Sequence, residues 1–176
     1  FHVQITVTPV NDAPVITGQN TIVTTEDVPL TIGFDYVIVS DPDHAFPTGT
    51  LTVFAGTNYT IEGNTITPLP DFHGALLVPI QVSDGLLSSN IFEATVSVLP
   101  FNDPPLIIGQ LPLSTEEDVP VTITLSHLLV TDADNTYPNG FTLRIQDGAG
   151  YSVSGTTITP ATDFTGTLNI SLVVND

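Results

Sequence analysis

Residues 92–106 read FEATVSVLPFNDPPL, and residues 1–15 read FHVQITVTPVNDAPV. From Phe92 to Val98 the apolar side chains occupy every second position, which predicts a β-strand with one buried face. In both segments this strand is followed by a Pro and then by an Asn-Asp pair. Short runs of Val, Ile, Thr and Leu, separated by Pro and Gly, continue the pattern and favour an all-β protein.

The acidic residues recur with the spacing of these two segments. Fourteen of the nineteen Asp and Glu residues occupy matching positions in two copies of a repeat of about 91 residues. The first copy holds Asp12, Glu26, Asp27, Asp41, Asp43, Asp71 and Asp84, and the second holds Asp103, Glu117, Asp118, Asp132, Asp134, Asp163 and Asp176. Asn11 and Asn102 match in the same way. Because Arg144 is the only Lys or Arg, these groups need an external counter-ion, and a hard cation with oxygen ligands fits best.

A length of 176 residues with this period gives two units, each long enough for a small core. We expect residues 1–10 to be the last strand of a preceding repeat, 11–101 to be repeat 1, and 102–176 to be repeat 2 without its last strand. Alternation predicts strands near 14–23, 29–38, 50–55, 58–62, 64–67, 75–83 and 90–99, and then near 105–115, 120–130, 141–146, 151–154, 156–159 and 166–174. Short strands without helical periodicity indicate tandem Greek-key seven-stranded β-sandwiches.

The two ends of the chain allow two interpretations. In the simpler one, the chain is a piece of a longer array of repeats. In the other, residues 1–9 of one chain complete repeat 2 of the next chain, and the chains polymerise by strand exchange.

Composition excludes several classes of function. The formal charge of −18 argues against nucleic acid or an anionic membrane surface as a partner. No apolar run is long enough to span a bilayer. The absence of Cys excludes disulfides and thiol chemistry, which leaves metal binding as a way to stabilise so small a domain.

Greek-key topology predicts where the carboxylates meet. Antiparallel strands reverse direction at every loop, so alternate loops of a sandwich lie at the same end. The predicted junction between the repeats therefore gathers Glu26, Asp71, Asn102, Asp103, Asp132, Asp134 and Asp176. Asn11, Asp12, Asp41, Asp43 and Asp84 form the matching half-site towards a preceding repeat, and Glu117 and Asp163 the half-site towards a following one.

Such a junction requires a cation. Two like unit charges ~4 Å apart repel by about 4 kcal/mol at an effective dielectric constant of ~20, so a carboxylate cluster separates the domains unless an ion neutralises it. Ligation by oxygen alone, without a His or Cys cluster, favours Ca²⁺ over zinc. Magnesium is less suited because it prefers a smaller octahedral shell and retains its waters.

These motifs resemble those of cadherin repeats. VNDAPV at 10–15 and FNDPPL at 101–106 resemble the cadherin inter-domain linker, in which an Asn-Asp pair precedes a Pro. DPD at 41–43 and DAD at 132–134 resemble the cadherin Asp-x-Asp motif. With a recurring Asp-Phe-x-Gly turn, the whole chain is similar to the bacterial cadherin-like tandem repeats of large secreted, RTX-type adhesins.

The resemblance implies a cadherin/immunoglobulin-like fold, calcium at the junctions and display outside the cell. It implies a calcium-rigidified structural repeat of an adhesin stalk or surface filament, with neighbouring repeats or like chains as partners and no membrane insertion. In the alternative, the repeats themselves bind carbohydrate or like repeats. Where animal cadherin linkers carry two further ligands, this chain has Pro9 and Ala13, then Pro100 and Pro104, so we expect one or two ions per junction rather than three.

Some of these residues also have a simpler interpretation. Asp27 and Asp118 are also explained as caps of turns, and Asp71 and Asp163 as turn formers. The four His residues, His2, His44, His73 and His127, do not recur at matching positions, so we expect them to be surface or turn residues. No nucleophile elbow or catalytic pair of carboxylates is apparent, and we do not expect an enzyme.

Overall fold

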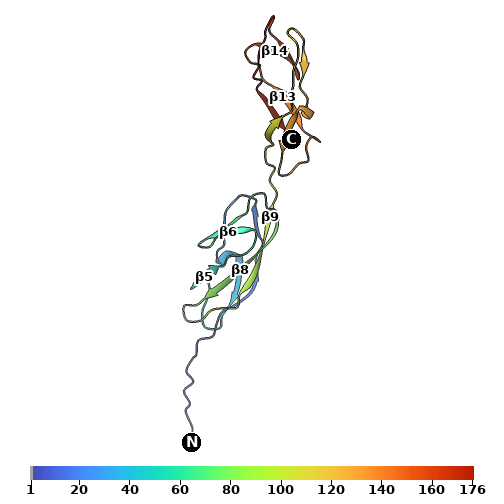
Figure 1. Cartoon of the computed structure of the whole chain (residues 1–176). Helices are drawn as coiled ribbons and strands as arrows, with labels where there is room; N and C mark the ends of the chain where they lie inside the picture. The colour runs from blue at the N-terminus through green and yellow to red at the C-terminus, as the bar shows by residue number, and fades with distance from the viewer. Residues whose placement is uncertain (1) are drawn as a thin grey trace. The chain divides into compact units, whose positions relative to one another are not determined.

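The computed structural model describes residues 2–176 (Figure 1). The chain divides into two compact units, unit 1 up to Phe101 and unit 2 from Asn102 to Asp176. Both units consist of β-strands joined by loops, with one short 3₁₀ helix each, η1 (Phe34–Tyr36) and η2 (Leu125–His127). The all-β sandwich prediction is therefore confirmed. Within the described residues, no helix is long and apolar enough to cross a bilayer.

Unit 1 has two layers of strands. One layer is a four-stranded sheet in the order β2 (Ile22–Thr25), β9 (Phe92–Leu99), β8 (Gly74–Ser83) and β5 (Thr50–Val53). In it β2 runs parallel to β9 and the other pairs are antiparallel. The other strands form the sheet β3 (Leu30–Thr31), β7 (Thr65–Pro68) and β6 (Tyr59–Glu62), and the pair β1 (Val15–Gln19) with β4 (Val37–Ser40).

One continuous core fills the space between the layers of unit 1. Along β8 every second side chain from Leu76 to Val82 is fully buried, and along β9 the same holds for Ala94, Val96 and Val98. Ile32 and Ile66 complete the core and are also inaccessible to solvent. Each such aliphatic side chain contributes about 1.5–3 kcal/mol through burial, so the alternating pattern accounts for much of the stability of the unit.

Unit 2 repeats this plan with fewer strands. Its strands are β10 (Leu106–Gln110) paired with β12 (Leu128–Thr131), the sheet β11 (Val121–Thr122), β15 (Thr157–Pro160) and β14 (Tyr151–Ser154), and β13 (Thr142–Ile145) paired with β16 (Leu172–Asn175). In the described part of the chain, no strand of unit 2 corresponds to β2 or β9. The buried residues form two small clusters around Ile158 and Leu128. A groove remains, lined by apolar residues such as Leu113, Leu168 and Ile170 and by polar ones such as Glu116, Glu117 and Asn169.

Several predicted strands differ from the observed ones. The segment 14–23 is two strands, β1 and β2, because the chain changes layers and pairs first with β4 and then with β9. The segment 29–38 is interrupted by η1. In unit 2, 111–115 and 166–171 are not strands; the positions that match their unit 1 partner β9 by the repeat spacing come after Asp176. Residues 2–14 are in no strand, and the expectation for Phe1 lies outside the described residues.

Candidate metal centres

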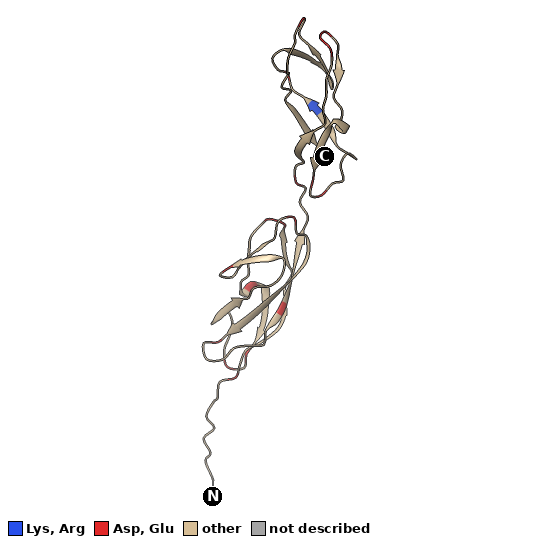
Figure 2. Ribbon diagram, in the orientation of Figure 1, with Lys and Arg blue, Asp and Glu red and all other residues tan. Residues whose placement is uncertain are grey.

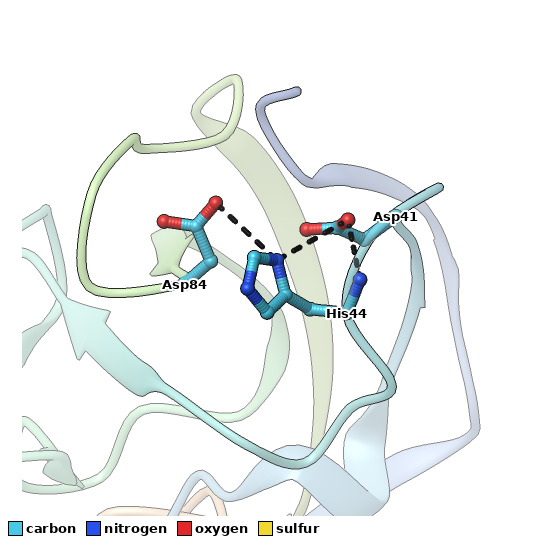
Figure 3. A group of neighbouring side chains, drawn as sticks. All are labelled: Asp41, His44 and Asp84. Carbon is cyan, nitrogen blue, oxygen red and sulfur yellow. Dashed lines mark hydrogen bonds and ion pairs between the residues drawn. The ribbon is translucent and has the colours of Figure 1, made fainter. Parts of the chain in front are cut away.

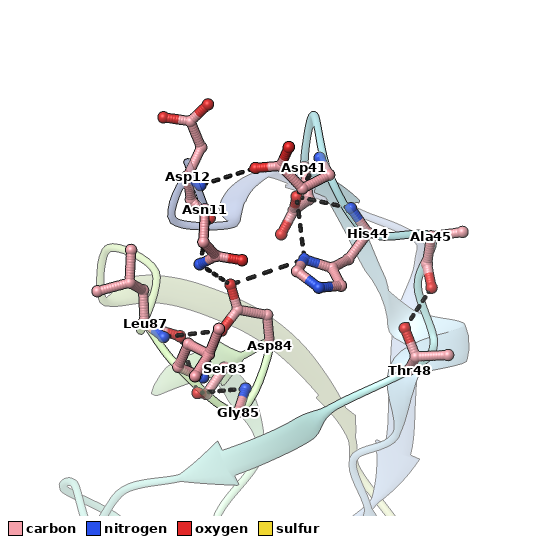
Figure 4. Close-up of polar contacts among 12 residues, drawn as sticks. Asn11, Asp12, Asp41, His44, Ala45, Thr48, Ser83, Asp84, Gly85 and Leu87 are labelled. Carbon is pink, nitrogen blue, oxygen red and sulfur yellow. Dashed lines mark hydrogen bonds and ion pairs between the residues drawn. The ribbon is translucent and has the colours of Figure 1, made fainter. Parts of the chain in front are cut away.

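Pairing of strands brings the predicted half-site of unit 1 together. Val15 at the start of β1 lies opposite Ser40 at the end of β4, so the loop before β1 meets the loop after β4. Asp84 follows the last residue of β8 and approaches from the other layer. Figure 4 shows the resulting cluster, in which residues separated by up to 73 positions are hydrogen-bonded.

Asp41 organises the loop after β4. Its Oδ1 accepts hydrogen bonds from the backbone N–H groups of Asp43 at 2.8 Å and His44 at 2.9 Å. The Oδ2 of Asp43 in turn accepts from the backbone N–H of Asp12 at 2.7 Å. These bonds are the turn chemistry expected of Asp, but they leave the second oxygen of Asp41 unused. That oxygen is buried and has no hydrogen-bond partner among the described residues.

Asp84 is held as a carboxylate by surrounding donors. Its Oδ1 accepts from the backbone N–H groups of Leu86 and Leu87, each at 2.7 Å, and its Oδ2 accepts from the Asn11 side-chain amide at 2.8 Å. The Leu87 N–H, the Asn11 amide and the Leu86 N–H lower the pKa of Asp84 to about 2. At neutral pH this side chain is therefore fully ionised.

His44 lies between the two carboxylates (Figure 3). Its Nδ1 is 3.7 Å from Asp41 Oδ1 and 3.9 Å from Asp84 Oδ2, and both carboxylate side chains are fully buried. Both distances exceed those of hydrogen bonds. In the part of the chain that the structure describes, Nδ1 is buried without a hydrogen-bond partner.

The half-site of unit 2 has the same backbone arrangement with a different side chain at the position of His44. Asp132 Oδ1 accepts from Asp134 and Asn135, and Asp134 Oδ2 accepts from the backbone N–H of Asp103 at 2.7 Å. The amide of Asn135 donates to Asn102 Oδ1 at 2.8 Å and to Asp176 Oδ2 at 2.7 Å. Asp132 Oδ2, like its counterpart in unit 1, is buried with no hydrogen-bond partner among residues 2–176.

At the opposite end of unit 1, Glu26 is the buried acid. Its side chain is 1% exposed, and its Oε1 accepts from the backbone N–H of Phe101. Its Oε2 is another buried oxygen without a hydrogen-bond partner in the described chain, and it lies 4.0 Å from His73 Nδ1. Asp27 and Asp71, at φ near 60°, adopt the left-handed conformation that Asp tolerates in turns.

The corresponding end of unit 2 is less organised. Glu117 is exposed, and Asp163 donates its backbone N–H to Asp118 Oδ1 at 3.3 Å. Asp118 and Asp163 share the positive φ of their counterparts, as expected of turn formers.

The structure thus gathers the predicted residues of each half-site within its own unit. Asn11, Asp12, Asp41, Asp43 and Asp84 meet in unit 1, and Asn102, Asp103, Asp132, Asp134 and Asp176 meet in unit 2. The complete junction, which joins Glu26 and Asp71 to the second set, involves both units and stays a prediction.

The sequence interpretation missed His44 and Asn135. The available signal was their place immediately after the Asp-x-Asp motif in both repeats.

The donor set fits a cation. Three buried carboxylate oxygens, from Asp41, Asp132 and Glu26, lack hydrogen-bond partners within residues 2–176, and an unpaired buried carboxylate is costly. Figure 2 shows how the acidic residues outnumber the one basic residue, Arg144, which is exposed in β13. Among residues 2–176, no Lys or Arg forms an ion pair with these groups.

Comparison with known proteins identifies the family. A family profile described as a bacterial Ig domain matches residues 11–98, half of the chain. Similar solved structures include the protocadherin γB4 extracellular domain, which shares 22% sequence identity with this chain. The alignment covers 96% of this chain and 30% of that chain, with a TM-score of 0.43.

Two further structures align over most of both chains. The human mucin-like protocadherin EC1-2 has 14% identity, coverage of 92% and 94%, and a TM-score of 0.39. The titin domains Z1Z2 in complex with telethonin have 12% identity, coverage of 94% and 95%, and a TM-score of 0.31. No curated protein sequence matches significantly. The profile match, which spans the strands of unit 1 from β1 to β9, confirms the prediction of a bacterial repeat with a cadherin/immunoglobulin-like fold: this chain belongs to the family of bacterial Ig domains.

Proposed function

We propose that this chain is a calcium-rigidified structural repeat of an extracellular adhesin stalk or surface filament. Its family supports a structural, adhesin-type repeat. We further propose that the bound ion is calcium, that the protein is extracellular, and that its partners are the neighbouring repeats.

Two oxygen atoms at the same repeat position carry the proposal. Asp41 Oδ2 and Asp132 Oδ2 are each buried at the end of a sandwich without a hydrogen-bond partner in the described residues. Leaving a buried polar group unpaired costs about 1–3 kcal/mol, and more for a charged one. Both repeats retain the same unfavourable arrangement, which is explained if an ion from solution is the partner.

Calcium is the ion that suits these ligands. In unit 2 the cluster of Asn102, Asp132, Asp134 and Asp176 offers oxygen atoms as donors, and Ca²⁺ accepts six to eight oxygens in flexible geometry. When bound, the ion supplies positive charge. The protein residues orient the oxygens through the backbone hydrogen bonds to Asp132 and Asp134.

Stabilisation by binding follows from mass action. Extracellular calcium modules bind with dissociation constants of roughly 10⁻⁴ to 10⁻³ M. At a free concentration of a hundred times the dissociation constant, one ion adds about 2.7 kcal/mol to the stability of the folded state. For a domain of this size that is a large fraction of the total. Ions that share ligands from successive repeats also limit bending between them, which is the property a stalk requires.

A calcium titration tests the proposal. The chain, freed of metal by a chelator, is titrated with CaCl₂ by calorimetry, and small-angle scattering is recorded in calcium and in chelator. We expect saturable binding and a stiffer particle in calcium. Absence of binding together with identical scattering curves would show that the carboxylates serve only as turn formers. Binding of the isolated chain to a glycan array would instead favour the alternative in which the repeats are adhesive.

A further inference from the structure

The two half-sites differ chemically at the position that follows the Asp-x-Asp motif. His44 follows the Asp41-Pro42-Asp43 motif of unit 1, and Asn135 takes its place in unit 2. We propose that Asp41, His44 and Asp84 form a binding site for a divalent transition-metal ion of the zinc class. The inference goes beyond the proposed calcium function, because it concerns another ion and only one of the two repeats.

Geometry places three donors around one point. The imidazole lies between the two carboxylates in Figure 3, and one donor atom from each residue lies within 4.8 Å of the other two. Two ligands of a tetrahedral zinc ion, each about 2.1 Å from the metal, lie about 3.4 Å apart. The observed separations of 3.7 and 3.9 Å from Nδ1 exceed this by only a few tenths of an ångström. The two carboxylates offer atoms within 4.8 Å of each other, so rotations of the side chains are needed to complete the site.

Two atoms of this cluster lack hydrogen-bond partners, whereas Asp41 Oδ1 and Asp84 Oδ2 each accept at least one hydrogen bond. Within the residues that the structure describes, Oδ2 of the fully buried Asp41 side chain has no hydrogen-bond partner, and neither has the buried Nδ1 of His44, whose side chain is 37% exposed. This pair of unsatisfied atoms, one nitrogen and one oxygen, is a second observation besides the acidic cluster itself. Both atoms gain a partner when an ion binds.

An ion pair of a protonated His44 does not explain the arrangement as well. Charge-assisted N–H···O bonds to carboxylates are about 2.7–2.9 Å long, and neither contact of Nδ1 approaches that length. Asp84 Oδ2 already accepts the Asn11 amide. The imidazole is thus close enough to share a metal with the carboxylates and too far to donate to them.

The chemistry of the donors selects the ion. Imidazole nitrogen favours zinc, copper and nickel over calcium, which prefers oxygen ligands. Two carboxylates and one imidazole provide three ligands, and water takes the fourth tetrahedral position of an open site. Calcium and the transition metal would share Asp41 and Asp84, so the two ions compete in unit 1.

Unit 2 is the internal control for this assignment. At the position of His44, the Asn135 amide donates hydrogen bonds to Asn102 and Asp176, so this position offers N–H donors in place of the imidazole nitrogen. An amide also offers no nitrogen lone pair to a metal. The same backbone and the same acids therefore give no transition-metal site in unit 2.

The test is a calorimetric titration of the metal-free chain with ZnCl₂, in a buffer that does not bind zinc. We expect one zinc ion per chain for the unmodified protein and loss of that isotherm in His44→Asn, which copies unit 2. His2→Asn, the same change at an exposed residue outside both half-sites, should keep it. Circular dichroism of each variant confirms the fold.

The outcomes separate this inference from the calcium proposal. Zinc binding that is absent in the unmodified chain, or unchanged in His44→Asn, would overturn it, even if calcium still binds. Zinc binding that depends on His44 would sustain it, even if calcium does not bind. Calcium added in excess should weaken the zinc isotherm of the unmodified chain, because both ions use Asp41 and Asp84.

Discussion

The two repeats carry matching side chains in β8 and its counterpart, yet bury them to different extents. Leu76, Val78 and Ile80 of β8 are fully buried, whereas Leu168, Ile170 and Leu172 at the same repeat positions are only partly covered. In unit 1, β9 pairs with β8 from Gly74 to Ile80, whereas the positions of unit 2 that match β9 come after Asp176. An apolar pattern therefore becomes a core only when the neighbouring strand covers it.

The two half-sites likewise carry matching polar residues in different surroundings. Each begins with Asn-Asp, continues with Asp-x-Asp and ends with Asp, and each leaves one aspartate oxygen buried and unpaired, considering residues 2–176. The position after the Asp-x-Asp motif holds His44 in unit 1 and Asn135 in unit 2. His44 offers a metal ligand, whereas Asn135 offers two hydrogen-bond donors.

The largest effect is expected from breaking the strand that distinguishes the units. Val96→Asp places a carboxylate in the fully buried face of β9, opposite Ile22 and Leu76. Burial of an unpaired charge costs several kcal/mol, so we expect a loss of about 4 kcal/mol or more and unfolding of unit 1 alone. Denaturation followed by NMR resolves the two units. Thr95→Asp, at the exposed neighbouring position, should cost less than about 1 kcal/mol.

A second experiment makes the units alike. A copy of residues 85–99 is fused after Asp176, which corresponds to Asp84, so that it can pair with the segment 166–175. The added strand should cover Leu168 and Ile170 and stabilise unit 2 by about 3 kcal/mol through apolar burial. Thermal unfolding measures the gain. The same fusion carrying Asp at the position of Val96 should give no stabilisation, and an equal gain from it would contradict the interpretation.

A third prediction compares an acidic residue of the repeat scheme with one outside it. Asp134→Ala removes a carboxylate that accepts the Asp103 N–H and should weaken calcium binding, with loss of up to about 2.7 kcal/mol of calcium-dependent stability at saturating ion. Each sandwich should remain folded. Glu62→Ala, at an exposed position of β6, should leave the calcium isotherm unchanged. Equal effects of the two changes on calorimetry would refute the assignment.

A fourth prediction concerns a variant that carries the histidine of the unit 1 half-site in the unit 2 half-site. Asn135→His places an imidazole beside Asp132 and Asp176, and we expect a second, weaker zinc ion per chain. The loss of the two amide hydrogen bonds should cost about 1–2 kcal/mol. Zinc calorimetry counts the ions. If the variant still binds only one zinc ion, then zinc binding is determined by the position of the imidazole ring and not by its identity.

The smallest effect concerns the protonation of Asp84 in the metal-free chain. Its folded pKa of about 2 lies below the ordinary value of 3.8. The stabilisation is thus fully present above about pH 4 and is lost as the pH falls through 2. Carboxyl NMR should show a midpoint near 2. Asn11→Ala, which removes the amide donor to Oδ2, should raise this pKa, while the N–H groups of Leu87 and Leu86 keep it below the ordinary value.

Much of the fold was predictable because strand formation depends on local pattern. Alternation marked β8 and β9 to within two residues, and the turns at Gly63 and Gly155 adopt the positive φ expected of tight hairpins. Segments whose strand character depends on a distant partner were predicted less well. Residues 111–115 contain alternating apolar positions, but apart from the hydrogen bond from the Leu111 N–H to the His127 carbonyl they pair with no other strand and form no strand in the described structure.

The sequence by itself determined the class of protein: two β-sandwich repeats with acids at fixed positions and almost no basic residues to neutralise them. Periodicity and composition suffice for this, since both act locally or on the chain as a whole. Tertiary structure decided which oxygen atoms are buried without a partner and that His44 stands between Asp41 and Asp84. These facts depend on pairing between segments up to 25 residues apart, as between β1 and β4, and no local pattern of side chains specifies the distance between two loops.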